Sequence, residues 1–307
     1  MPTDIAEQLQ VAGHPGGIAS HDGGRKITKK TSKYEADFYE TCKSKTSGDS
    51  GGDALTRFKA FMPTYHGKIE LDGTTEKTDE VSVIIENLTQ GFKRPNILDV
   101  KLGKQLWDER ASQEKRERMD ANAKDTTSWT EGLRLTGWQV WDNDTKQTVF
   151  TSKTFGKAIS ADLLPLGLRL FFGCASVEDW TAYSDVVKGK EEVAKQGPAS
   201  LPKTATVQIL KRVILPQIEE VESIFETLEL RMRGGSLLFI YEGDQEALLQ
   251  ALQEPQSTSR GPFAVVKLID FAHARLAPGE GPDEGILTGV RTFKTLVKKL
   301  LAELEGE

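Results

Sequence analysis

The stretch "PNILDVKLG", residues 95–103, places an aspartate and a lysine two positions apart among aliphatic residues. Alternate residues of a β-strand point to opposite faces, so a strand here directs Asp99 and Lys101 to one face and its aliphatic residues to the other. Pro95 begins the stretch, and Gly103 permits a close backbone approach or a sharp exit. The roots of these two side chains are then roughly 6.5–7 Å apart along the strand, and each side chain can contact a different part of a ligand. The spacing alone favours the alternative of a half-exposed strand with a surface ion pair, which contributes little stability.

The composition is that of a soluble globular protein with room for one large domain or two lobes around a cleft. The chain has 307 residues, of which 28% are charged. It has no run of 18 apolar residues and no basic, apolar start of the secretory type. Its two cysteines, Cys42 and Cys174, are too few for a disulfide framework or a Cys-rich zinc site. We therefore expect an intracellular protein, in the nucleus or cytoplasm, without a membrane anchor.

The charge is distributed unevenly along the chain. The net charge of −6 argues against direct nucleic-acid binding, yet residues 93–124 carry nine Lys/Arg against six Asp/Glu. A basic excess within an acidic protein favours a small, strongly anionic ligand. The alternative is a solvated helix with ion pairs at i,i+4 spacing.

The order of predicted elements divides the chain into two parts. Residues 1–88 are predicted to form a small lobe of antiparallel strands, and residues 89–307 a larger α/β lobe. In the first part we expect a strand near 25–30, a helix over 34–43, a loop over 44–53, and a hairpin of 61–71 with 81–88. In the second part we expect helices over about 104–124, 160–172, 204–233 and 289–304, strands over 133–142, 147–155, 236–244 and 263–274, and a loop over 185–203.

The stretch "VVKLIDFAHA", residues 265–274, ends an apolar strand with Asp270. Burying a carboxylate is costly unless a cation or hydrogen-bond donors compensate it. Facing a cleft, Asp270 is suited to hold Mg²⁺ while water and phosphate oxygens complete the coordination. The alternative is that Asp270 caps a turn or pairs with an arginine. His273 either donates to an anion or caps a loop.

Two further places fit a nucleotide. Lys29 or Lys30, in "GRKITKK", can reach across a cleft to the α- and β-phosphates. Glu86 to Leu88, in "VIIENL", lie where the two predicted lobes join, and backbone groups at such a hinge can pair with an adenine edge.

Several known site motifs are missing from the sequence. It contains no G-x-x-x-x-G-K-[ST] loop, no G-x-G-x-x-G and no H-R-D catalytic loop. The glycine-rich "VAGHPGG", residues 11–17, matches no phosphate-loop spacing and is interpreted as a loop or substrate rim. A G-x-S-x-G serine motif and histidines at zinc-ligand spacing are also lacking.

Together these stretches resemble the inositol polyphosphate kinase family. "PNILDVKLG" fits the family signature P-x-x-x-D-x-K-x-G at every fixed position, and "LIDFAHA" resembles its I-D-F motif. "GGSLLFIYEGD" resembles its S-S-L-L motif, with Gly235 at the first serine position. "VAGH", "FGKAIS" and "DEGILTGVRTF" fit as well, so the similarity covers nearly the whole chain. The multikinase branch is the most similar, ahead of the hexakisphosphate kinases and trisphosphate 3-kinases.

The resemblance implies an α+β, two-lobed, protein-kinase-like fold with ATP in the cleft and Mg²⁺ on Asp270. Asp99 is then near the ribose or the acceptor hydroxyl, and Lys101 bridges the transferred phosphoryl group and the inositol phosphate. Lys29 is the nucleotide-phosphate lysine, and Glu86 and Leu88 also belong to the nucleotide site. Ser236 supports the metal site and His273 approaches the substrate. An inositol-phosphate-binding segment over about 104–125 adds further expected substrate contacts, which are Lys104, Lys115 and Arg116, with Lys157 outside it.

The expected activity is ATP-dependent phosphorylation of inositol tris- and tetrakisphosphate towards the pentakisphosphate. Positioning and charge neutralisation matter more than covalent chemistry in such a transfer, and two lysines with a metal-binding aspartate supply both. One alternative is a hexakisphosphate kinase that makes pyrophosphates. Another is an inositol-phosphate-binding scaffold in a transcription or signalling complex. Phosphoinositide headgroups remain possible further ligands.

Overall fold

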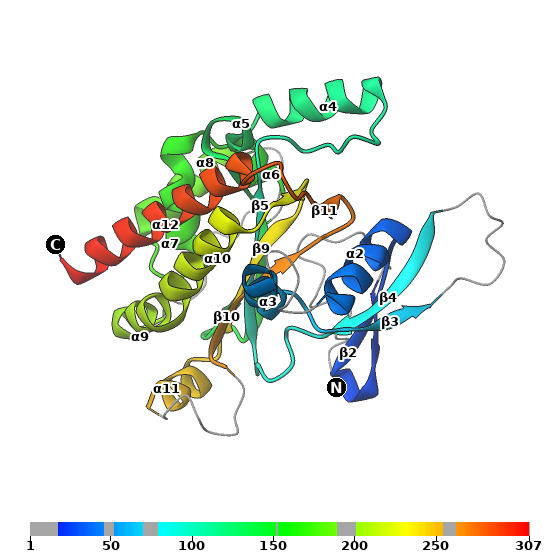
Figure 1. Ribbon diagram of the computed structural model, residues 1–307. Helices are drawn as coiled ribbons and strands as arrows, with labels where there is room; N and C mark the ends of the chain where they lie inside the picture. The colour runs from blue at the N-terminus through cyan, green and yellow to red at the C-terminus, as the bar shows by residue number, and fades with distance from the viewer. Residues whose placement is uncertain are drawn as a thin grey trace.

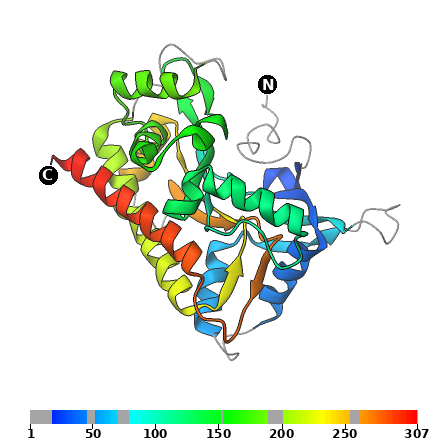
Figure 2. The same ribbon diagram turned by 90° about the horizontal axis from the view of Figure 1, so that it is seen from above.

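The computed structural model describes residues 18–45, 52–69, 79–151, 153–188, 201–253 and 262–306. The prediction for "VAGHPGG" and most of the predicted loops 44–53 and 185–203 lie outside the described residues. Within them, the strands form a four-stranded, a five-stranded and a two-stranded sheet. Figure 1 shows the small N-terminal sheet on the right, beside the larger sheet and its helices. Figure 2 shows the same arrangement from above, with the C-terminal helix crossing the larger part.

The N-terminal sheet has the order β1-β2-β4-β3 and is antiparallel throughout. Its strands are β1 (Ile18–His21), β2 (Lys26–Ser32), β3 (Tyr65–Ile69) and β4 (Glu80–Glu86), with a 3₁₀ turn at Asp22–Gly24. Helix α2 (Lys33–Ser44) follows β2 directly and buries Phe38 and Tyr39. The strand near 25–30, the helix over 34–43 and the hairpin are therefore confirmed.

Helix α3 (Gly52–Phe61) was not predicted, since the sequence was read as a loop up to residue 53 and a strand from residue 61. The helix buries Leu55, Phe58 and Phe61, whose spacing fits one helical face. This face packs between the two parts of the chain, since the Phe58 ring contacts Phe38 of α2 on one side and Phe225 and Phe271 on the other. Beside it, Arg57 Nε donates to Glu220 at 2.6 Å. Residues 1–88 therefore do not pack as an isolated lobe, and the boundary at residue 88 stays a prediction.

The larger sheet has the order β10-β9-β5-β6-β7, with antiparallel pairing throughout. Its strands are β5 (Pro95–Leu102), β6 (Leu133–Asp142), β7 (Gln147–Thr151), β9 (Ser236–Glu242) and β10 (Ala264–Ile269). The signature stretch forms β5, in the middle of this sheet. Leu98, Val100 and Leu102 are fully buried, as alternation predicted. The same face packs on the C-terminal helix α12 (Glu284–Glu305), where Phe239 and Phe293 stack with ring centroids 4.4 Å apart.

The remaining elements surround this sheet, and two of the predicted helices have the wrong bounds. The helices are α4 (Gln113–Lys124), α5 (Thr127–Glu131), α6 (Lys153–Ala158), α7 (Leu164–Phe171) after a 3₁₀ turn, α8 (Val177–Val187), α9 (Lys203–Ile209), a π-helical segment (Leu210–Ile214), α10 (Leu215–Thr227) and α11 (Gln245–Gln253). A two-stranded ribbon pairs β8 (Leu230–Met232) with β11 (Ala274–Leu276). The helix expected over 104–124 begins only at residue 113, where Ser112 Oγ accepts from the Lys115 amide. The helix expected over 204–233 ends at residue 227, because the chain then pairs as β8. None of the helices in the described ranges is long and apolar enough to cross a membrane.

Candidate active site

Strand register brings three of the predicted site residues to one end of the larger sheet. Lys101 on β5 pairs with Ser236 on β9, and Ser236 pairs with Ile269 on β10. Asp270 follows Ile269 directly, with a left-handed backbone (φ +67°). Residues directly opposite in antiparallel strands share a face, so Lys101 and Ser236 lie on the same side of the sheet, next to the end of β10.

Lys29 of the small sheet completes this cluster from 241 residues away. Its Nζ lies 2.6 Å from Asp270 Oδ1. The neighbouring Lys30 is exposed, which places Lys29 rather than Lys30 at the cluster. The Asp270 side chain keeps 43% of its surface accessible, so a ligand can approach the pair.

Glu35, in the first turn of α2, is a member of the cluster that the sequence analysis missed. Its carboxylate is 1% exposed and accepts from Lys29 Nζ at 2.9 and 3.2 Å. It also accepts from the hydroxyl of Thr31 and from the amide of Phe271, the residue after Asp270. Glu35 therefore holds both the lysine and the backbone beside the aspartate. Nothing in the local sequence marks it, because its partners lie on two other elements.

The electrostatics of the pair favour the charged form of both groups. Burial alone would lower the pKa of Lys29, but the carboxylates of Asp270 and Glu35 outweigh it and raise the pKa. Burial alone would raise the pKa of Asp270, but Lys29, with smaller contributions from Lys101 and Lys153, lowers it. Lys153 begins α6 and was not among the predicted residues.

Asp99 lies deeper in the sheet than Lys101, with 3% exposure. Burial, and then the negative charge of Asp270, raise its pKa, whereas Lys101 opposes the shift. The hydroxyls of Ser236 and Thr136 lie close enough to favour its charged form. Within the described ranges, however, Asp99 Oδ1, Ser236 Oγ and Thr136 Oγ1 each lack a partner of good hydrogen-bond geometry. Buried polar atoms of this kind are costly unless a ligand satisfies them.

Arg134 is a second residue that the sequence analysis missed. It lies directly opposite Lys101 in the β5–β6 pairing and is 7% exposed. Its Nη1 donates to Asn122 Oδ1 of α4 at 3.1 Å, and no ion pair of Arg134 occurs in the described part of the chain. Burial lowers its pKa, opposed by Asp99. Like charges directly opposite one another destabilise a sheet, so Lys101 and Arg134 together are suited to an anion.

The other predicted substrate residues are spread along the basic segment. Lys104 follows Gly103, whose φ of +95° turns the chain out of β5. Lys115 is half-buried in the first turn of α4. Arg116 stacks on Trp107 and donates to the carbonyls of Ala111 and Glu109, so its donors already hold the preceding loop. Lys157 is exposed near the end of α6, one turn beyond Lys153. Their roles as phosphate contacts stay predictions.

The predicted hinge for the adenine follows β4. Glu86 accepts from the amide and hydroxyl of Thr64, so its carboxylate fastens the hinge to the chain before β3. The Asn87 amide donates to the carbonyl of Arg25. The amide of Leu88 has no partner among the described residues, which leaves it available to a base edge.

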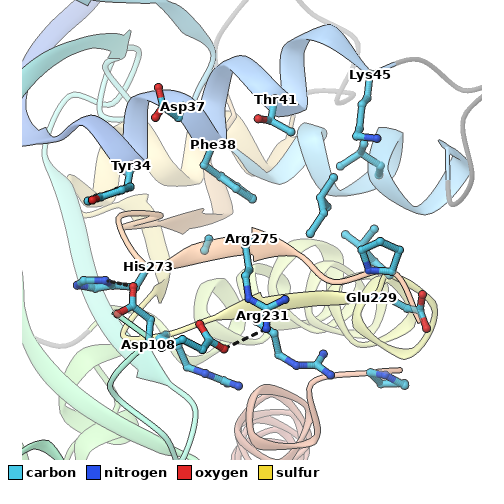
Figure 3. A pocket seen from close by; sticks show the side chains of 18 of the residues that line it. Tyr34, Asp37, Phe38, Thr41, Lys45, Asp108, Glu229, Arg231, His273 and Arg275 are labelled. Carbon is cyan, nitrogen blue, oxygen red and sulfur yellow. Dashed lines mark hydrogen bonds and ion pairs between the residues drawn. The ribbon is translucent and has the colours of Figure 1, made fainter. Parts of the chain in front are cut away.

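His273 lines a cavity of about 940 Å³ between α2 and the β8–β11 ribbon, which Lys29, Lys101 and Asp270 do not line. Figure 3 shows His273 and Asp108 there, with Tyr34 of α2 across from them. His273 Nδ1 lies 2.8 Å from Asp108 Oδ2. Of the residues predicted for catalysis or binding, His273 alone lines this cavity in the part of the chain that the structure describes.

The carboxylates around Asp270 fit a divalent cation only together with a ligand. In the described ranges, His, Cys, Asp and Glu form no group of three or more that could hold a metal ion. Hard cations bound at nucleotide sites take one or two carboxylates plus phosphate and water oxygens. Asp270, with the unpartnered oxygens of Asp99 and Ser236 beside it, is such an oxygen donor set.

The two sheets and the lysine–aspartate cluster where they meet define the class of kinases with a two-part, protein-kinase-like fold. Residues 82–298 match the family described as inositol polyphosphate kinase. The chain belongs to this family.

Individual relatives agree with this assignment. Inositol polyphosphate multikinase of Saccharomyces cerevisiae is 27% identical, over 94% of this chain and 96% of the relative. Inositol hexakisphosphate kinase 3 of Mus musculus is also 27% identical, but over 73% of this chain and 51% of the relative. The crystal structure of the S. cerevisiae inositol phosphate multikinase, in complex with ADP and Mn²⁺, matches with a TM-score of 0.69 at 28% identity, covering 91% of this chain and 100% of that chain. The predicted fold, and the greater likeness to multikinases than to hexakisphosphate kinases, are confirmed.

Proposed function

We propose that this inositol polyphosphate kinase transfers the γ-phosphoryl group of ATP to hydroxyls of inositol tris- and tetrakisphosphate, with Mg²⁺ as its divalent ion. The observation that carries the proposal is the meeting of Lys29, Lys101 and Asp270 at one end of the larger sheet. The ADP and Mn²⁺ in the structure of the yeast multikinase support the use of a nucleotide and a divalent ion by this chain.

Each side chain of the cluster has a separate task in this proposal. Lys29, held by Glu35, binds the nucleotide phosphates once the nucleotide draws it from Asp270. Lys101 binds the phosphoryl group in transit, and Arg134 beside it binds a phosphate already on the inositol ring. Asp270 would hold Mg²⁺, which supplies neutralisation of the charge on the phosphates. Asp99, whose buried Oδ1 has no hydrogen-bond partner among the described residues, contacts a hydroxyl of the ribose or the acceptor.

The experiment that tests the proposal uses ATP, Mg²⁺ and a panel of inositol tris- to hexakisphosphates, with the products resolved by chromatography. Phosphorylation of the tris- and tetrakisphosphates is the expected result. Pyrophosphate formed from the hexakisphosphate selects the hexakisphosphate-kinase alternative. Binding without any product selects the scaffold alternative, in which the protein serves a transcription or signalling complex.

Two expectations lie outside this experiment. Placement in the nucleus or cytoplasm is tested by imaging a fluorescent fusion of the full chain. Phosphoinositide headgroups as substrates are tested by adding vesicles that contain a phosphatidylinositol bisphosphate to the same assay.

A further inference from the structure

The side chain of His273 is held by the carboxylate of Asp108, in the loop between β5 and α4. Asp108 is 5% exposed, and its Oδ2 lies 2.8 Å from His273 Nδ1. The carboxylate accepts from Nε and Nη2 of Arg110 in the same loop. Burial alone would raise the pKa of Asp108, but Arg110 and His273 lower it, so this carboxylate has no proton to donate.

The geometry therefore fixes which ring nitrogen of His273 carries the proton. A hydrogen bond between Nδ1 and an ionised carboxylate requires the hydrogen on Nδ1. Arg110 Nη2 also lies 3.3 Å from Nδ1, but a guanidinium only donates, so that contact is not a hydrogen bond once Nδ1 is protonated. Nε2 is left without a partner among the described residues, on a side chain that lines the cavity.

Arg110 extends this arrangement into the N-terminal part of the chain. Its guanidinium lies 3.6 Å from the ring centroid of Tyr34 on α2, and its Nη2 donates to the carbonyl of Ala272 at 3.0 Å. One side chain thus contacts α2, the loop after β10 and the loop after β5. The backbone of His273 is held independently, since its carbonyl accepts from the Arg233 amide at 3.1 Å.

We propose that Asp108 and Arg110 are positioning residues for the substrate, with Asp108 orienting His273 so that Nε2 faces a phosphate of the inositol and Arg110 locking Asp108 against α2. This inference rests on the proposed function, because it requires His273 to contact the substrate. A hydrogen-bonded carboxylate fixes the tautomer and orientation of a functional histidine in many sites. The stacking on Tyr34 links that orientation to α2, whose Glu35 holds Lys29.

A double-mutant cycle tests the inference, with the KM for inositol trisphosphate and the KM for ATP measured separately. Asp108→Asn allows the other tautomer, and we expect it to raise the KM for the inositol phosphate about tenfold and to leave the KM for ATP within about twofold. In the His273→Ala background the same substitution is expected to have no further effect on either constant. Arg110→Lys keeps the charge but loses the planar fork and the stacking, and is expected to act in the same direction.

The outcomes separate positioning from a purely structural role. Arg291→Gln is the matched control, because Arg291 also pairs with two carboxylates, those of Glu222 and Glu226, but does not line this cavity. It is expected to leave both KM values unchanged. If Asp108→Asn and Arg110→Lys act equally in the presence and absence of His273, or raise both KM values together with a lower melting temperature, the positioning role is wrong. If His273→Ala alone leaves the KM for inositol phosphate unchanged, the predicted contact of His273 with the substrate is wrong, whereas the proposed function itself fails only if the parent protein phosphorylates no inositol phosphate.

Discussion

Lys29 Nζ and Asp270 Oδ1 lie 2.6 Å apart although 241 residues separate them in the chain. The contact joins the small sheet to the end of the larger one. The carboxylate of Glu35 also accepts a hydrogen bond from Lys29 Nζ, so the charge of Lys29 stays compensated when a ligand separates it from Asp270. In the proposed function, this contact marks the place where the nucleotide phosphates bind.

Lys29→Met removes the cation of this pair. We expect kcat to fall at least about 100-fold, the loss typical of a group that stabilises transition-state charge. Steady-state kinetics with ATP and inositol trisphosphate measure it. Lys30→Met is the matched control, because Lys30 is adjacent and exposed. Equal losses in the two variants would mean that the lysine acts only through general charge.

Asp99→Asn separates stability from activity. The raised pKa of Asp99 means that the folded state disfavours its ionised form, so the ionised carboxylate costs stability above its ordinary pKa of 3.8. We therefore expect the variant to have a higher melting temperature than the parent at pH 7, with a gain that shrinks as the pH falls towards 4. Turnover should decrease at the same time. Calorimetry across this pH range decides, and a lower melting temperature at pH 7 would contradict the argument.

Arg134→Met tests the pair of cations on β5 and β6. Without substrate, the variant loses a buried charge that opposes Lys101, so its melting temperature is expected to stay the same or rise. The KM for the inositol phosphate is expected to rise about 10- to 100-fold, the loss typical of a charge-assisted hydrogen bond. Arg118→Met, at an exposed position of α4, is the control. A similar KM in both variants would exclude Arg134 from the substrate site.

Gly289→Ala tests the packing beneath the site. A Cβ at this position would lie 2.1 Å from the carbonyl oxygen of Gly132, the residue between α5 and β6, so the helix and this backbone must separate to admit it. We expect the free energy of unfolding to fall by about 2 kcal/mol or more, measured by chemical denaturation. Thr295→Ala, exposed on the same helix, should be close to neutral. An equal effect at both positions would show that helix propensity, not close packing, decides.

The sequence was sufficient where information is local. Alternation in β5 predicted its buried leucines, and the register of β5, β9 and β10 then brought Lys101 and Asp270 to the same end of the sheet. Helix α3 was missed because it begins with Gly52 and Asp53, the last two residues of a glycine- and serine-rich stretch whose composition predicts a loop. The charged composition of residues 104–112 predicts a helix but fits a loop equally well, and the structure has a loop there.

The missed site residues share a different cause. Their roles depend on partners that lie on other elements, which holds for Glu35, Arg134 and Asp108. The partner of Asp108, for example, is His273, 165 residues away in the chain. A buried arginine opposite Lys101 can be recognised only when the β5–β6 register, with its bulge after Asp99, is known. A single sequence contains no signal for that register.

The most direct test of the central claim, that Lys29, Lys101 and Asp270 surround the transferred phosphoryl group, is the turnover of Asp270→Asn as a function of Mg²⁺ concentration, with the melting temperature measured in parallel. The side chain is isosteric and Lys29 keeps Glu35 as its partner, so the fold should persist with a melting temperature within a few degrees of the parent. Turnover is expected to fall at least about 1,000-fold at every Mg²⁺ concentration. Undiminished Mg²⁺-dependent turnover would contradict the assignment of the site.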